Sequence, residues 1–226
     1  ETCEHLRLCH RIKKGRFNQL LSEFRSSVDR EEGTSDVLWL SFKRQVQFLK
    51  ETGFVDETDR LTSDGQWASN LRLDQPLLIA EAIRKGAYEE ISSWALAGGL
   101  APFVWDRDQE IELRVKGALD LTVIEDMFEK LLNRIDGIRS LKDKRGFQSP
   151  PLMFWPAAAL FMWAKGITWK ELLYFVPADE GDMASLIMRT ADHLRQVAAL
   201  RETHAGLASV AAESIELILR EPVYIL

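Results

Sequence analysis

Several features that would assign a protein to a class at once are scarce in this sequence. Only two cysteines occur in 226 residues, so the chain has no disulfide framework, as is usual in a reducing compartment. No apolar run reaches the roughly 20 residues that a bilayer-spanning helix needs. Even residues 150–164 form too short a run, which Pro156 interrupts. These absences predict a soluble, cytoplasmic protein without a membrane partner.

The N-terminus begins without a methionine and without an apolar secretory core, so we expect the chain to be a fragment of a longer protein. Both cysteines, Cys3 and Cys9, fall there beside His5 and His10, and Cys and His are the usual zinc ligands. A closed zinc site needs four well-placed ligands, and this spacing matches no common zinc finger. We therefore expect free thiols and no metal site, with half of a metal knuckle at Cys3 and Cys9 as the alternative.

The signatures of common enzymes are also missing. The sequence contains no GxxxxGK[ST] phosphate loop, no GxGxxG turn, no HExxH and no GxSxG motif. The four histidines are scattered along the chain. The acidic cluster of Asp179, Glu180 and Asp182 is better explained as negative charge at the start of a helix than as a catalytic pair. We expect neither a catalytic residue nor a cofactor in this chain.

Positive charge is in short supply as well. The chain has 29 basic and 35 acidic side chains, for a net charge of −6. Nonspecific binding of nucleic acid depends on Lys and Arg, so any such binding by this protein must be local. Residues 1–30 have a modest local excess of basic side chains.

What the sequence does contain is helical periodicity. Its hydrophobic content of 46% is typical of a globular protein, and apolar residues recur at spacings of three and four from Leu121 to Ile138. We predict an all-α fold, an irregular bundle of about eight to ten helices with one very short β-hairpin near residues 54–62. The expected helices include residues 14–31, a helix from Leu38 to Leu49 that Gly53 ends, residues 75–85, a short helix from Ile91 to Gly98 and Gly99, a further turn or helix over residues 100–105, and a central apolar segment over residues 152–164.

The segment after this central helix predicts two more helices. Thr168 lies three residues before Glu171, the spacing of a capping box, so a helix should start near Trp169. Pro177 cannot continue that helix, and the acidic cluster after it favours the start of a longer one.

The longer helix is expected to be amphipathic. A helical wheel places its apolar side chains in one core-facing stripe. The stripe consists of Met183, Leu186, Ile187, Ala191, Leu194, Val197 and Ala198. Opposite lies a line of hydrogen-bonding side chains, Ser185, Arg189, Asp192 and Gln196, spaced by about 5 to 6 Å per turn. Such a line could follow a polymer backbone, although periodicity alone favours the solvated face of a surface helix.

Seven tryptophans could stack on nucleic-acid bases. Because indole rings in apolar helices bury large areas, we expect most of them in the core and at most one or two exposed.

Five segments stand in the order and spacing typical of one family. They are LKETGFVDETDRLTSDGQWAS, DQPLLIAEAIRKG, FMWAKGITWKELL, EGDMASLIMRTADHLRQ and IELILREPV. Together they resemble the C-terminal DSHCT domain of superkiller-like, exosome-associated DExH-box RNA helicases and their bacterial-type relatives. The resemblance covers residues 36–223, and the basic residues 1–35 resemble the end of the arch insertion that leads into that domain.

The resemblance implies a helical bundle over residues 36–226 with a ratchet helix over about 181–203. It implies a parent helicase that hydrolyses ATP with Mg in two RecA-like domains, on which this bundle packs, and that moves 3′ to 5′ along RNA. In this family the ratchet helix contacts single-stranded RNA, and the matching positions are Arg189 and Asp192. Family members commonly have basic residues where this chain has Ser185 and Met188, which lowers the expected capacity for phosphate contacts.

In this interpretation Arg189 contacts a phosphate or stacks on a base, while Asp192 orients Arg189 or accepts a hydrogen bond from a ribose hydroxyl or a base edge. Two alternatives stay open. One is a helical protein-interaction scaffold, which an exposed apolar patch around residues 155–169 would favour. The other is the equivalent domain of a DNA helicase, since no base-reading residue here separates RNA from DNA.

Overall fold

The computed structural model of the chain describes residues 38–115, 117 and 119–223. The chain divides into two compact units, Glu1–Leu49 and Lys50–Leu226. The helix expected over residues 14–31 and the candidate metal ligands Cys3 and Cys9 lie outside the described residues.

A helix over residues 38–51 contains the boundary between the two units. In the first unit, the Trp39 and Phe42 rings stack with their centroids 5.6 Å apart, and the Lys43 ammonium lies 5.0 Å from the Trp39 ring. Gly53, with a φ of 75°, follows the helix in the left-handed conformation that the sequence predicts.

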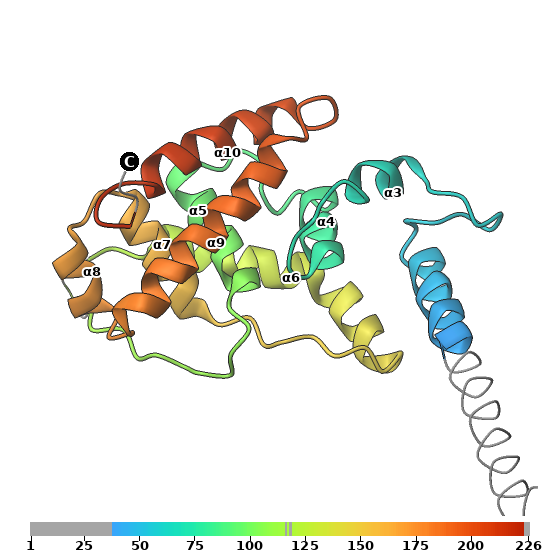
Figure 1. The fold of residues 1–226 in the computed structure, drawn as a ribbon, viewed down its shortest axis with the longest axis horizontal. Helices are drawn as coiled ribbons and strands as arrows, with labels where there is room; N and C mark the ends of the chain where they lie inside the picture. Colours follow the sequence, from blue (N-terminus) through green and yellow to red (C-terminus); the bar gives the residue numbers. More distant parts are fainter. Residues whose placement is uncertain (1–37, 116, 118, 224–226) are drawn as a thin grey trace, which may run out of the picture. The chain divides into compact units, whose positions relative to one another are not determined.

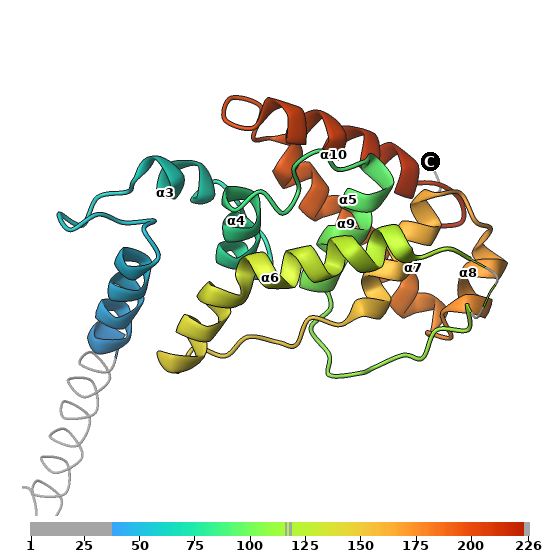
Figure 2. The same cartoon turned by 180° about the vertical axis from the view of Figure 1, so that it is seen from behind.

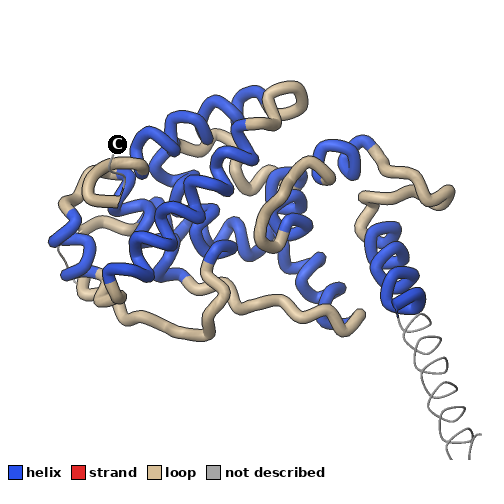
Figure 3. Tube along the Cα trace, in the orientation of Figure 1, coloured by secondary structure: helices blue, strands red, loops and turns tan. Residues whose placement is uncertain are grey.

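The second unit is a bundle of helices joined by loops (Figure 3). Counting the helix over residues 38–51, the described part of the chain has nine helices, in agreement with the predicted all-α fold. An antiparallel bridge between Val55 and Leu61 forms the predicted short hairpin. The helices of the second unit are α3 (Ser63–Ala68), α4 (Pro76–Arg84), α5 (Ser93–Val104), α6 (Thr122–Lys144), α7 (Phe154–Ala164), α8 (Trp169–Phe175), α9 (Glu180–Ala198) and α10 (Ala205–Ile218).

The centre of this bundle is formed by α5 and α7. Helices α9 and α10 lie in front of them in Figure 1, and α6 lies in front of them in the reverse view of Figure 2. Every residue of α7 from Trp155 to Ala164 is buried, which confirms the central position predicted for this apolar segment. Helices α6 and α9 therefore lie on opposite faces of the central pair.

Helix α5 corrects one prediction. Gly98 and Gly99 do not end a short helix, because α5 runs without a break from Ser93 to Val104. A Cβ on Gly98 would lie 2.8 Å from the Ala157 carbonyl oxygen and 2.6 Å from Ile124 Cδ1. The glycine is therefore needed for close packing of α5 on α7. In the sequence alone, the same glycine resembles a signal that ends a helix.

The two helices predicted after the central one are both present. Thr168 and Glu171 form the expected capping box at the start of α8. Helix α9 begins at Glu180 as expected and ends at Ala198, earlier than the predicted residue 203. The chain has to turn after Ala198 because α10 begins at Ala205 and packs against α9. The predicted apolar stripe of α9 is buried in full.

The tryptophans follow the predicted distribution. Trp67, Trp105, Trp155 and Trp163 are buried, and Trp39 is 54% exposed. The indole N–H of Trp163 donates to the Ile218 carbonyl at 2.8 Å. Because Trp155 and Trp163 are buried, they form no exposed apolar patch of the kind that would favour a scaffold.

None of the described helices combines the length and the apolar character that crossing a bilayer requires.

Candidate nucleic-acid interface

The polar line predicted from the sequence lies along the surface of α9. Ser185 and Asp192 are exposed, and Arg189 and Gln196 are partly exposed. The Arg189 side chain retains 38% of its accessible surface, so its guanidinium points out of the protein rather than into the core. The placement follows from helical geometry, because the buried stripe fixes which side of α9 faces solvent.

Arg189 has two acidic partners that sequence analysis did not identify. Its Nη2 lies 2.8 Å from Asp74 Oδ2, and its Nη1 lies 3.8 Å from Asp106 Oδ2. Asp74 comes from the segment before α4, and Asp106 comes from the loop that follows α5. Only the tertiary fold brings these carboxylates to α9, so no local spacing could have indicated them.

Asp192 forms its ion pair with Arg195 on the next turn of α9. The expectation that it orients Arg189 is therefore not met, because Asp74 and Asp106 are the acidic partners of that guanidinium. The Asp192 side chain remains 69% exposed. An exposed pair of this kind contributes at most about 1 kcal/mol, so Asp192 can readily exchange Arg195 for another hydrogen-bond donor.

A short backbone segment is fastened to the C-terminal half of this face. The Asp74 N–H donates to His193 Nε2 at 3.1 Å, and the Arg72 N–H reaches Gln196 Oε1 at 3.5 Å. Gln196 thus already serves as an acceptor within the protein. Of the four predicted side chains, Ser185 and Asp192 are the more exposed, whereas Arg189 and Gln196 both contact other segments of the chain.

His193 is held in one tautomer by these contacts. Its Nδ1 lies 3.0 Å from the Arg189 carbonyl oxygen, which can only accept, so Nδ1 carries the proton and Nε2 accepts from Asp74. The ring is buried, and this burial lowers the pKa of His193 below its ordinary value. The imidazole is therefore a neutral structural link between α9 and residue 74.

A loop segment also contacts the N-terminal end of this face of α9. Arg107 Nη1 lies 2.7 Å from Asp182 Oδ2 in the first turn of α9, and the Arg107 guanidinium lies 5.3 Å from the Trp105 ring. These contacts hold the loop that bears Asp106 against α9.

Charges on this face are balanced rather than strongly positive. The cations Arg107, Arg189 and Arg195 are each paired with a carboxylate. A planar guanidinium can exchange a carboxylate for a phosphate with the same pair of N–H donors, and a carboxylate can accept from a hydroxyl. The arrangement suits reversible binding of a sugar-phosphate backbone. Within the described residues, no group of three His, Cys, Asp or Glu side chains is placed to hold a metal ion.

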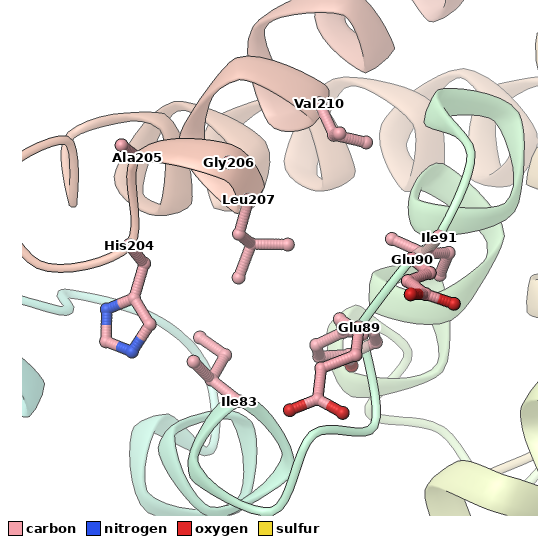
Figure 4. A pocket seen from close by; sticks show the side chains of 10 residues that line it. Ile83, Glu89, Glu90, Ile91, His204, Ala205, Gly206, Leu207 and Val210 are labelled. Carbon is pink, nitrogen blue, oxygen red and sulfur yellow. The ribbon is translucent and has the colours of Figure 1, made fainter.

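A separate pocket of about 400 Å³ lies near the start of α10. Figure 4 shows Ile83 and Leu207 pointing toward one another, with His204 on one side and Glu89 on the other. Glu89 and Glu90 both line this pocket and are exposed. Because their carboxylates repel phosphate groups, we do not assign this pocket to nucleic acid.

Comparison with known proteins now assigns the class. The family model of the DSHCT (NUC185) domain matches residues 58–225, and the chain belongs to this family. It is also similar to the "DExH-box ATP-dependent RNA helicase DExH15 chloroplastic" of Arabidopsis thaliana, with 24% identity over 212 residues. That alignment covers 92% of this chain and 18% of the relative, so the chain spans about a fifth of the relative's length.

Proposed function

We propose that this chain is the C-terminal accessory domain of an ATP-dependent 3′–5′ RNA helicase and that α9 is its ratchet helix, which contacts single-stranded RNA. Membership of the DSHCT family and similarity to a relative named as an RNA helicase support the helicase assignment. The observation that carries the α9 assignment is the outward-facing guanidinium of Arg189, which lies one turn from the exposed carboxylate of Asp192.

In this proposal α9 holds the strand between the steps of the motor. Arg189 binds a phosphate or stacks on a base, and Asp192 accepts from a ribose hydroxyl or a base edge. Ser185 adds a hydrogen bond on the turn before Arg189. The RecA-like domains of the parent polypeptide bind ATP and Mg and supply the motion, while this domain packs on them.

The finer features of the parent follow from resemblance. We propose a superkiller-like, exosome-associated helicase of the bacterial type, with RNA as the substrate. Location in the cytoplasm stays a prediction, and so does the expectation that Cys3 and Cys9 are free thiols rather than metal ligands. The domain of a DNA helicase and a protein-interaction scaffold are the alternatives.

The test is binding of the 226-residue chain to a labelled single-stranded oligouridylate. Arg189→Ala is expected to weaken binding about fivefold, or roughly 1 kcal/mol, since it removes one partly exposed charge-assisted contact. The plot of log affinity against log salt should flatten by about 0.7 if one phosphate contact is lost.

Arg134→Ala is the matched control, since Arg134 is an exposed arginine of α6 and α6 packs on the central helices opposite α9. Equal effects of the two substitutions would contradict a role for α9. Matched single-stranded DNA in the same titration tests the DNA alternative, and absence of binding to either polymer would favour the scaffold.

A further inference from the structure

The guanidinium of Arg189 is held by two carboxylates that belong to different parts of the chain. Asp74 Oδ2 lies 2.8 Å from Nη2, and Asp106 Oδ2 lies 3.8 Å from Nη1. Asp74 and Asp106 are 49% and 67% exposed, so both reach the same solvent as Arg189. Any phosphate that binds this guanidinium therefore meets two negative charges already in contact with it.

The backbone near each aspartate is positioned by a second contact to α9. The Asp74 backbone N–H donates to His193 Nε2, and His193 follows Arg189 by one helical turn. Asp106 is followed at once by Arg107, whose guanidinium pairs with Asp182 in the first turn of α9. The segments that contain Asp74 and Asp106 are thus held next to Arg189 by contacts to α9.

This placement sets up a competition. A phosphate oxygen and a carboxylate oxygen compete for the N–H donors of a guanidinium, and Asp74 already accepts a hydrogen bond from Nη2 of Arg189. A displaced carboxylate would also lie close to the phosphate, where like charges repel. The two aspartates must therefore lower the affinity of this position for a phosphate.

We propose that Asp74 and Asp106 are affinity-setting residues that keep the hold of α9 on single-stranded RNA weak enough for release at every step. This inference rests on the proposed function of α9. A strand that passes along a helix has to leave each contact as readily as it enters it. When the phosphate leaves, the carboxylates of Asp74 and Asp106 form their ion pairs with the Arg189 guanidinium again.

The experiment measures binding of the 226-residue chain to a labelled single-stranded oligouridylate for wild type and for Asp74→Asn/Asp106→Asn. Asparagine keeps the size of the side chain and leaves the Asp74 backbone N–H free to donate to His193. Affinity is expected to rise about two- to fivefold for each carboxylate removed, the range set by exposed ion pairs. The salt dependence should become steeper as well.

Two controls separate this effect from a general change of charge. Asp126→Asn/Asp136→Asn also removes two negative charges, from exposed positions of α6. It should leave the affinity within twofold of wild type. Adding Arg189→Ala to the Asp74→Asn/Asp106→Asn variant should abolish the gain. Thermal melts establish that each variant is folded.

The outcomes distinguish the two levels of the proposal. If Arg189→Ala weakens binding but Asp74→Asn/Asp106→Asn does not strengthen it, the affinity-setting role is wrong and the function of α9 stands. If the α6 control strengthens binding to the same extent, net charge is the cause and the role is again wrong. If no substitution on α9 or beside it changes binding, both proposals fail.

Discussion

At the scale of single residues, the face of α9 depends on side chains that neutralise one another. Arg189 is paired with Asp74 and Asp106, and His193 accepts the backbone hydrogen bond that positions Asp74. A neutral imidazole is required for this, because protonated Nε2 would face the Asp74 N–H as a second donor. The state of His193 therefore affects the geometry around Arg189.

The first prediction at this scale concerns pH. Burial lowers the pKa of His193 in the folded protein, so between that value and the unfolded value of about 6.5 the unfolded chain binds more protons. The contribution of His193 to the free energy of unfolding should be present in full above pH 6.5 and should decrease as the pH falls below that value. Asp74, Arg189 and Asp192 are the charged groups that face the ring.

Urea unfolding followed by circular dichroism at pH values between 7.5 and 5 tests this prediction. Burial lowers the pKa of His204 as well, so both of these histidines contribute to the wild-type slope. His193→Leu should remove one of them and give a shallower dependence on pH. An unchanged slope in that variant would show that His193 is not the group responsible.

At the scale of elements, Gly98 inside α5 allows the two central helices to approach closely. Gly98 faces the backbone of α7, whereas Gly137 on α6 has nothing within 4 Å of the position of a Cβ. The same substitution at these two helical glycines should therefore have opposite effects.

Gly98→Ala should destabilise the protein by about 1 to 3 kcal/mol, because the new methyl overlaps the Ala157 carbonyl and forces a shift of packed helices. Gly137→Ala should stabilise it by up to about 1 kcal/mol, the gain in helix propensity. Urea denaturation of both variants checks the pair. Equal effects at the two sites would refute the packing argument.

At the scale of the whole molecule, the sequence predicts the architecture better than the site. The apolar stripe of α9, the Thr168–Glu171 capping box and the burial of α7 all follow from local spacing, and all are present. Local patterns fail where a distant element decides. In the sequence Gly98 resembles a helix stop. In the structure a glycine is required there because the Ala157 carbonyl of α7 leaves no room for a Cβ.

The same limit applies to the candidate site. Periodicity places Arg189 and Asp192 on the outer face of α9, because the buried stripe fixes that face. It gives no information on Asp74 or Asp106, since their proximity to Arg189 depends on how α4 and α5 pack in the bundle. The partners of a side chain are thus less predictable than its exposure.

The central claim, that the polar face of α9 contacts a single strand, is tested most directly by cross-linking. Single-stranded RNA that carries 4-thiouridine would be irradiated with the 226-residue chain, and the modified peptides would be mapped by mass spectrometry. We predict cross-links in residues 185–196 of α9 and in the adjoining segments that contain Asp74 and Asp106. Cross-links confined to α6 or to the pocket of Figure 4, with none on α9, would contradict the account.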